Sequence, residues 1–116
     1  MLRRMKRLMV LALLAATAQP AYAAGASNFT LVNGTGASLA ELSIRRSGTQ
    51  EWKSLGAAPS AGARSSMTFS DPDCAFDIRA KVAGSPVTWA GVNLCDVKSV
   101  TLKKDDNAGA WVDYDQ

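Results

Sequence analysis

The stretch Cys74-Ala75-Phe76-Asp77-Ile78-Arg79-Ala80-Lys81-Val82 decides the fold of this chain. Its apolar positions alternate with polar or small ones, the period of two that is typical of a strand with one buried face. Gly84-Ser85 then gives a turn signal, and a second extended run, residues 86–95, leads back to Cys95. A turn centred on Gly84-Ser85 would place Cys74 opposite Cys95 in a non-hydrogen-bonded pair, where side chains are close enough for a disulfide. We therefore predict a hairpin closed by a Cys74–Cys95 bond.

The register of this hairpin stays open at the level of sequence. Pro86 has no N–H, so a tight turn at Gly84-Ser85 would lose its closing hydrogen bond. Strict pairing would also leave Val92 and Leu94 on the polar face of the hairpin. A bulge at Gly91 would return both side chains to the core, but it would shift the cysteine register by one residue.

The rest of the chain reads as short strands separated by turn signals. Asn33-Gly34-Thr35-Gly36 tolerates positive φ, and residues 56–62 have the small residues and proline of a loop. We expect extended segments at residues 28–32, 39–46, 64–70, 97–104 and 110–114, and the short apolar segment 52–55 could add an edge strand. With the hairpin they make about seven strands and no convincing helix, which predicts a small antiparallel all-β sandwich as a single domain, residues 24–116.

Residues 1–23 have the features of a secretion signal. A basic start is followed by the apolar run Leu8 to Ala16, which is too short to span a bilayer. Ala21-Tyr22-Ala23 supplies small residues at the two positions that a signal peptidase reads. We expect cleavage after Ala23, a periplasmic or secreted product and no stable membrane insertion; an uncleaved anchor or a core helix is the alternative.

The basic character of the sequence comes from this leader. The chain has 13 Lys and Arg against 10 Asp and Glu residues, and Arg3, Arg4, Lys6 and Arg7 precede the apolar run. Without them the net charge is about −1, which argues against nucleic acid as a partner.

The two cysteines are expected to be paired in an oxidising compartment. Closing the loop between them should stabilise the domain by about 3 kcal/mol. A free reactive thiol is the alternative, but the sequence has no histidine to activate it and no Cys-x-x-Cys spacing.

Several motifs together resemble a known pattern. The chain contains, in order, Phe29-Thr30-Leu31-Val32-Asn33-Gly34-Thr35-Gly36, Trp52, Cys74-Ala75-Phe76-Asp77-Ile78-Arg79 and Asn93-Leu94-Cys95. This order resembles the pattern F-x-L-x-N-x-T-G … C-x-F-D-I-R … N-L-C of a loose group of small exported bacterial β-sandwich proteins. The resemblance implies the fold, and it identifies no activity and no functional residue.

Histidine and several common catalytic motifs are missing from the sequence. The sequence has no histidine, which excludes Ser-His-Asp and Cys-His catalysis and His-liganded zinc. It has no P-loop, dinucleotide-binding or G-x-S-x-G motif. We therefore predict a non-enzymatic protein without catalytic residues, cofactor or dedicated metal site.

The acidic residues allow two narrower expectations. Asp77 and Arg79 share the polar face of their strand, so we expect a surface ion pair of little energetic weight. Weak calcium binding is an alternative to solvated turns at two places, Asp71 with Asp73 and Asp105 with Asp106.

Tryptophan is the better indication of a binding surface. Trp89 falls on the buried face of the hairpin and is expected in the core. Trp52 and Trp111 lie outside the apolar pattern and could stack on a sugar or on a side chain of a partner; the alternative is that they cover the ends of the sandwich.

These features favour an exported domain that binds an unidentified protein in the cell envelope or outside the cell. A protease inhibitor or immunity protein that presents a loop such as residues 56–63 is one alternative. A carbohydrate-binding module that uses Trp52 or Trp111 is another. The sequence fixes neither the partner, protein or glycan, nor the oligomeric state.

Overall fold

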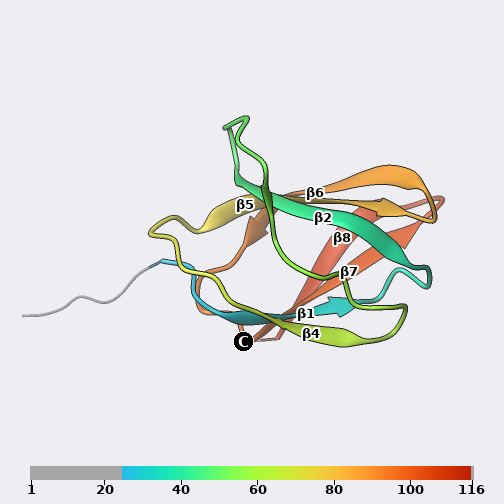
Figure 1. Cartoon of the computed structure of the whole chain (residues 1–116), viewed down its shortest axis with the longest axis horizontal. Coiled ribbons are helices and arrows are strands. Elements are labelled where there is room, and N and C mark those ends of the chain that lie inside the picture. The colour runs from blue at the N-terminus through green and yellow to red at the C-terminus, as the bar shows by residue number, and fades with distance from the viewer. Residues whose placement is uncertain (1–24, 116) are drawn as a thin grey trace, which may run out of the picture.

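The computed structural model describes residues 25–115, which form two four-stranded sheets packed as a sandwich (Figure 1). One sheet has the order β4-β1-β7-β8, and the other has the order β3-β2-β5-β6. The strands are β1 (Phe29–Asn33), β2 (Leu39–Arg46), β3 (Lys53–Ser54), β4 (Arg64–Met67), β5 (Ala75–Val82), β6 (Ser85–Asn93), β7 (Ser99–Asp105) and β8 (Gly109–Asp115). The predicted all-β sandwich is confirmed, with eight strands instead of about seven.

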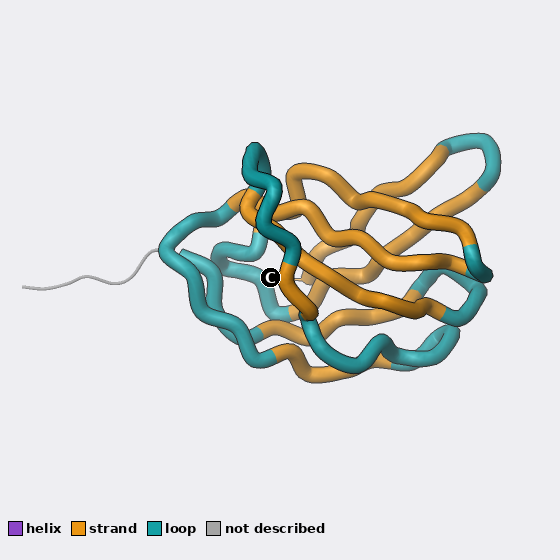
Figure 2. The backbone as a smooth tube through the Cα atoms, turned by 45° about the horizontal axis from the view of Figure 1, so that its top comes forward, coloured by secondary structure: helices purple, strands orange, loops and turns teal. Residues whose placement is uncertain are grey.

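The connections between these strands are loops and turns throughout the described range (Figure 2). Residues 25–115 accordingly offer no helix with the length and apolar character needed to cross a membrane. The predicted signal peptide and its cleavage site lie outside the described residues. One pair of strands departs from the antiparallel prediction, because β1 and β7 run parallel.

The core lies between the two sheets and is built from the alternate residues that the strand patterns predicted. Leu31, Val100 and Leu102 of the first sheet are fully buried, as is Ile78 of the second. The predicted core position of Trp89 is confirmed, since it is 1% exposed. Its indole Nε1 donates a hydrogen bond to the Lys103 carbonyl at 2.9 Å, which ties β6 of one sheet to β7 of the other.

The β5–β6 hairpin turns one residue earlier than predicted. Ala83 and Gly84 both have positive φ, 50° and 87°, and Val82 pairs with Ser85 next to them. Because Ser85 takes the hydrogen-bonded position beside a two-residue turn, Pro86 falls in the next, non-hydrogen-bonded position and needs no N–H there.

The bulge considered at Gly91 is present. The pairing of β5 with β6 shifts between Phe76 and Ile78, and Gly91 has a φ of 65°. Val92 and Leu94 are each 1% exposed as a result.

The predicted disulfide is confirmed, but its predicted position in the ladder is wrong. Cys74 and Cys95 are bonded, with their Cα atoms 5.1 Å apart. Both lie just beyond the ends of β5 and β6, and the Leu94 N–H donates to the Cys74 carbonyl at 2.9 Å. The earlier turn and the bulge together place Leu94, and not Cys95, opposite Cys74.

Candidate binding surface

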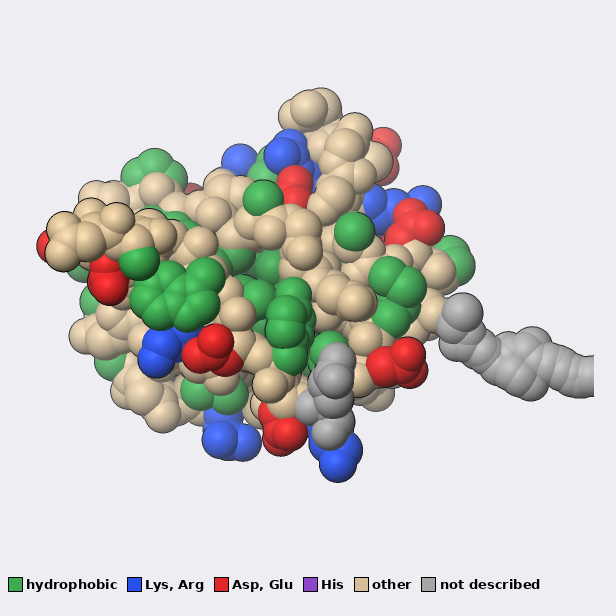
Figure 3. Space-filling model, turned by 180° about the vertical axis from the view of Figure 1, so that it is seen from behind, with side chains coloured by type: hydrophobic (Ala, Val, Ile, Leu, Met, Phe, Trp, Pro, Cys, Tyr) green, Lys and Arg blue, Asp and Glu red, His purple; other side chains and the backbone are tan. Residues whose placement is uncertain are grey.

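Strand β8 is an exposed edge of the sandwich. It is the last strand of its sheet, and every residue in it except Val112 is exposed. Trp111 and Tyr114, which are 37% and 42% exposed, are the large hydrophobic side chains open to solvent in residues 25–115. Figure 3 views the molecule from behind Figure 1 and shows hydrophobic side chains open to solvent next to acidic ones.

The pairing with β7 determines where the β8 side chains point. Val100 is buried and pairs with Tyr114, so Tyr114 lies on the inner face of the sheet. Its hydroxyl accepts a hydrogen bond from the Asn93 N–H at 2.9 Å and so joins β8 to β6. Trp111, Asp113 and Asp115 are the alternate residues and lie on the outer face.

The backbone of β8 is open on the side away from β7. The Gly34 N–H donates to the Leu102 carbonyl at 2.9 Å, so Leu102 and its alternate neighbours in β7 direct their backbone groups towards β1. The odd-numbered residues of β7 therefore pair with Trp111, Asp113 and Asp115. It follows that Ala110, Val112 and Tyr114 direct their N–H and C=O groups to the open edge.

The other three edge strands are less suited to pairing. Strand β3 has two residues and β4 has four. Strand β6 has Pro86 near its start, a bulge at Gly91, and the Asn93 N–H already bonded to Tyr114. Within the described residues, β8 is the long edge without such protection.

The two aspartates of β8 differ from most other acidic residues in their surroundings. The ion pairs among residues 25–115 include Asp71, Asp73 and Asp77, but neither Asp113 nor Asp115. Their register partners on β7 are the uncharged Thr101 and Ser99. The outer face of β8 therefore carries two negative charges without a cationic partner in the described range, beside an exposed indole.

Trp52 lies on the opposite side of the sandwich from Trp111. The guanidinium carbons of Arg45 and Arg79 are 4.4 Å and 3.9 Å from the centre of its ring. Arg79 stands between the buried Ile78 and Ala80, so it lies on the outer face of the β3-β2-β5-β6 sheet. The two tryptophans considered as a binding surface are thus not brought together, and Trp52 already has cation–π partners.

Asp77 does not form the predicted pair with Arg79. It is 6% exposed and accepts hydrogen bonds from Arg45 Nε at 2.9 Å, Ser47 Oγ at 2.8 Å and the Gly91 N–H at 3.0 Å. Burial alone would raise the pKa of Asp77, but these three donors outweigh it and hold the pKa below its ordinary value. The carboxylate thus accepts a hydrogen bond at the bulge, from Gly91, which has no register partner on β5.

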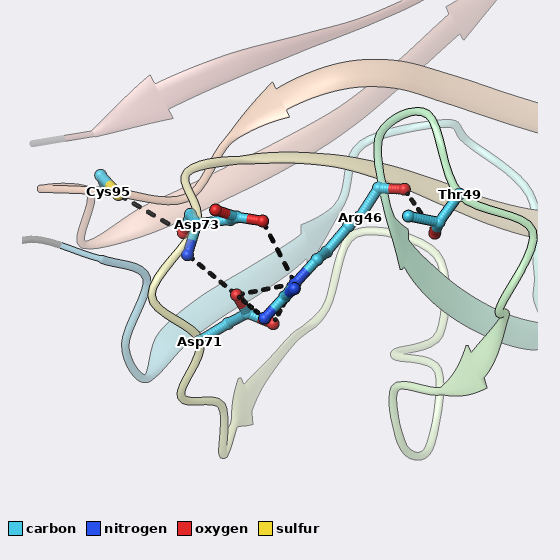
Figure 4. A network of polar contacts seen from close by, with 5 residues as sticks. All are labelled: Arg46, Thr49, Asp71, Asp73 and Cys95. Carbon is cyan, nitrogen blue, oxygen red and sulfur yellow. Dashed lines mark hydrogen bonds and ion pairs between the residues drawn. The ribbon is translucent and has the colours of Figure 1, made fainter.

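A second polar network lies near the disulfide (Figure 4). Arg46 Nη2 lies 3.1 Å from Asp71 Oδ1, and Arg46 Nε lies 3.2 Å from Asp73 Oδ2. Burial would raise the pKa of Asp71, but the Asp73 N–H and the Arg46 guanidinium lower it. The network borders a hollow of about 300 Å³ whose lining includes Ile44, Phe69 and Phe76.

In both of the aspartate pairs considered for calcium, carboxylate groups already bind other groups of the domain. Asp71 and Asp73 bind Arg46, which brings a positive charge to that place. Asp105 Oδ1 accepts from the Asn107 N–H at 2.8 Å and closes the β7–β8 turn. No group of three or more potential metal-ligating Cys, His, Asp or Glu residues occurs within residues 25–115.

The loop considered as an inhibitory segment is held by one buried residue, through its side chain and its backbone. Asn33 is fully buried, and its Nδ2 donates to the Ala37 carbonyl at 2.8 Å and the Pro59 carbonyl at 3.1 Å. Its backbone carbonyl accepts from the Gly62 N–H at 2.9 Å. The Asn33 N–H also donates to the Ala63 carbonyl at 3.0 Å, so residues 56–63 are fixed to Asn33 at three points.

Sequence reasoning singled out Trp111 but missed the open edge beside it. Tyr114, Asp113 and Asp115 were assigned to a terminal strand without a role. The strand itself could be predicted from alternation, whereas its place at the edge follows from the strand order. No local pattern encodes that order.

Comparison with known proteins gives support for the fold alone. No protein-family model matches the chain, and no curated protein sequence matches it. The chain is similar to a solved NMR structure of a protein from Eubacterium rectale, with a TM-score of 0.55 and 16% sequence identity. The similarity covers 78% of this chain and 89% of that one.

Proposed function

We propose that this protein is an exported, non-enzymatic domain that binds another protein through β8. The observation that carries this proposal is the combination on one strand of the two exposed large hydrophobic side chains, Trp111 and Tyr114, with an open backbone edge. Tyrosine and tryptophan are enriched at protein interfaces because they bury a large apolar area while their O–H or N–H group keeps a hydrogen-bond partner.

Export is part of the proposal. The Cys74–Cys95 disulfide is consistent with an oxidising extracellular compartment. Residues 1–23 add the basic, apolar and small-residue segments of a secretion signal. Mass spectrometry of the protein recovered outside the cytoplasm should give a chain that begins at Ala24, whereas an intact residue 1 would contradict export with cleavage.

The non-enzymatic assignment rests on the chemistry of the polar residues. The sequence has no histidine, and Asp77, the buried carboxylate among residues 25–115, has each of its oxygens bonded within the domain. Its lowered pKa keeps it ionised near neutral pH, so it is not poised as a general acid.

Photo-crosslinking tests protein binding directly. A benzoylphenylalanine residue at position 111, in cells that naturally make the protein, should give a discrete higher-mass adduct on irradiation. The same residue at Thr88, on the outer face of the other sheet, is the matched control. Adducts of equal yield at both positions, or none at position 111, would contradict the proposal.

A glycan is the second candidate ligand, and the position of Trp111 favours it. Trp111 lies on an outer face that also carries Lys103, Thr101 and Asp113. The Trp111 indole could stack on a sugar ring while the neighbouring polar side chains form hydrogen bonds with the hydroxyl groups of the sugar, an arrangement suited to glycan binding. Retention on a polysaccharide column that is lost on Trp111→Ala would support this candidate, and no retention would remove it.

A further inference from the structure

We propose that β8 binds its partner by strand addition, and that the partner contributes an extended segment with Lys or Arg at alternate positions. This inference rests on the proposed protein-binding function and specifies how the binding takes place. It follows from three features of β8: the direction of its free backbone groups, its exposure, and the charge of its outer face.

The backbone of β8 provides the first argument. Ala110, Val112 and Tyr114 direct their N–H and C=O groups away from β7, so an added strand would meet a regular row of donors and acceptors. Edge strands of this length are usually protected by a bulge, a proline or a covering segment. Within the described residues, β8 has none of these.

The outer face of β8 provides the second argument. In an antiparallel addition, residues opposite Trp111, Asp113 and Asp115 would occupy non-hydrogen-bonded positions, where facing side chains approach most closely. Neither aspartate is in an ion pair within residues 25–115. Cationic side chains opposite them would complete two cross-strand pairs, and a third beyond them could stack on the Trp111 indole.

The same charges disfavour a second copy of this chain as the occupant. Two β8 strands joined edge to edge would bring four carboxylates, two from each copy, to one seam. Like charges across a strand pair are destabilising, so Asp113 and Asp115 act against self-pairing while they favour a basic segment.

The test uses a capped nine-residue peptide of alternating Lys and Val and the folded domain, residues 24–116, with its disulfide intact. We expect the peptide to shift the amide NMR signals of β8 and to slow hydrogen exchange at Ala110, Val112 and Tyr114. A matched peptide with Glu in place of Lys should bind at least about tenfold more weakly. Shifts confined to another surface, or equal affinity for both peptides, would overturn the inference.

Two further variants separate strand addition from simple charge attraction. The double variant Asp113→Lys with Asp115→Lys, which alters exposed side chains alone, should reverse the preference and bind the Glu peptide. N-methylation of the Val residues, whose backbone would face β8, should abolish binding, whereas N-methylation of the Lys residues should be tolerated. Loss of binding with both methylated peptides, or with neither, would show that no strand is added.

The outcomes also separate this inference from the proposed function. If the peptide does not bind but crosslinking at position 111 still gives a discrete protein adduct, strand addition is wrong and protein binding stands. If both fail, both proposals are wrong. The free domain should be a monomer in analytical ultracentrifugation. A stable dimer whose dissociation constant changes in either direction with Asp113→Lys would assign the β8 edge to a second copy of this chain and would overturn the proposal of a different partner.

Discussion

Replacing Asp77 by alanine should be among the most destabilising single changes outside the apolar core. The carboxylate is 6% exposed and accepts three hydrogen bonds, from Arg45, Ser47 and Gly91. Each hydrogen bond to a charged group is worth about 1.5–3 kcal/mol, but the three are not additive because they share one acceptor group.

The cost follows from what each donor does once the carboxylate is gone. The Arg45 side chain is 22% exposed, so it can regain water at modest cost. Gly91 is an exposed residue, so its N–H can also regain water, and the cost is that of the lost hydrogen bonds to a charged group, about 1.5–3 kcal/mol each and not additive. We therefore expect Asp77→Ala to lower the free energy of unfolding by about 3 kcal/mol, a large share of the roughly 5–13 kcal/mol usual for a domain of this size.

Denaturation with guanidinium chloride under non-reducing conditions measures this loss of unfolding free energy. In a separate thermal denaturation, the melting temperature should fall by about 15 °C. Asp77→Asn, which keeps one acceptor oxygen and loses the charge, should lose about half as much. Asp113→Ala, at an exposed position, is the control and should stay within about 0.5 kcal/mol of the wild type. A loss below about 1 kcal/mol for Asp77→Ala would refute the role given to this carboxylate.

Four other predictions follow from the same contacts. The pKa values of Asp71, Asp77 and Asp105 are lowered from the ordinary 3.8, so their contribution to stability is present above about pH 4 and is lost as the pH falls through the lower folded values. Acid denaturation should show this loss, and Asp77→Asn should flatten the stability curve below about pH 4. Replacing both Cys74 and Cys95 by serine should cost about 3 kcal/mol in chemical denaturation, since the bond spans a sequence separation of 21 residues; an unchanged midpoint would contradict this. Asn33→Ala should cost about 2–3 kcal/mol and expose residues 56–63 to limited proteolysis, whereas uncut protein would show that the loop does not depend on Asn33. Acrylamide should quench Trp111 most and Trp89 least, so Trp111→Phe should remove the most accessible part of the emission; an unchanged quenching curve would place Trp111 in a shielded site.

The hairpin shows how far local pattern carried the prediction. Alternation along β5 predicted its buried face, and two cysteines in a chain that we predict to be exported indicated their bond. The turn was misplaced by one residue because Ala83, which has no turn preference, adopts a φ of 50° ahead of Gly84. The need to bury Val92 and Leu94 indicated the bulge at Gly91, and the bulge and the earlier turn together moved Cys95 out of the ladder.

The candidate site depends on neighbours that are distant in sequence. Asp77 was paired with Arg79 because both lie on one face of β5, but residues two apart along a strand are farther from each other than a directly paired residue of the next strand. That neighbour is Arg45, and it is known only once β2 is placed beside β5. The placement of Trp52 and Trp111 on opposite faces follows in the same way from the sheets, because Trp52 directly precedes β3 of one sheet and Trp111 lies on β8 of the other.

The carboxylates of this domain therefore fall into two groups with separable consequences. The negative charge of Asp77 is balanced inside the domain by Arg45. Removing Asp77 should therefore change stability while the β8 surface keeps its charge. Asp113 and Asp115 make no ion pair in residues 25–115, so their reversal should leave the melting temperature nearly unchanged while it alters partner choice. A partner-binding defect in Asp77→Asn at a temperature where that variant is fully folded would contradict this separation, because it would require Asp77 to act on a surface that it does not touch.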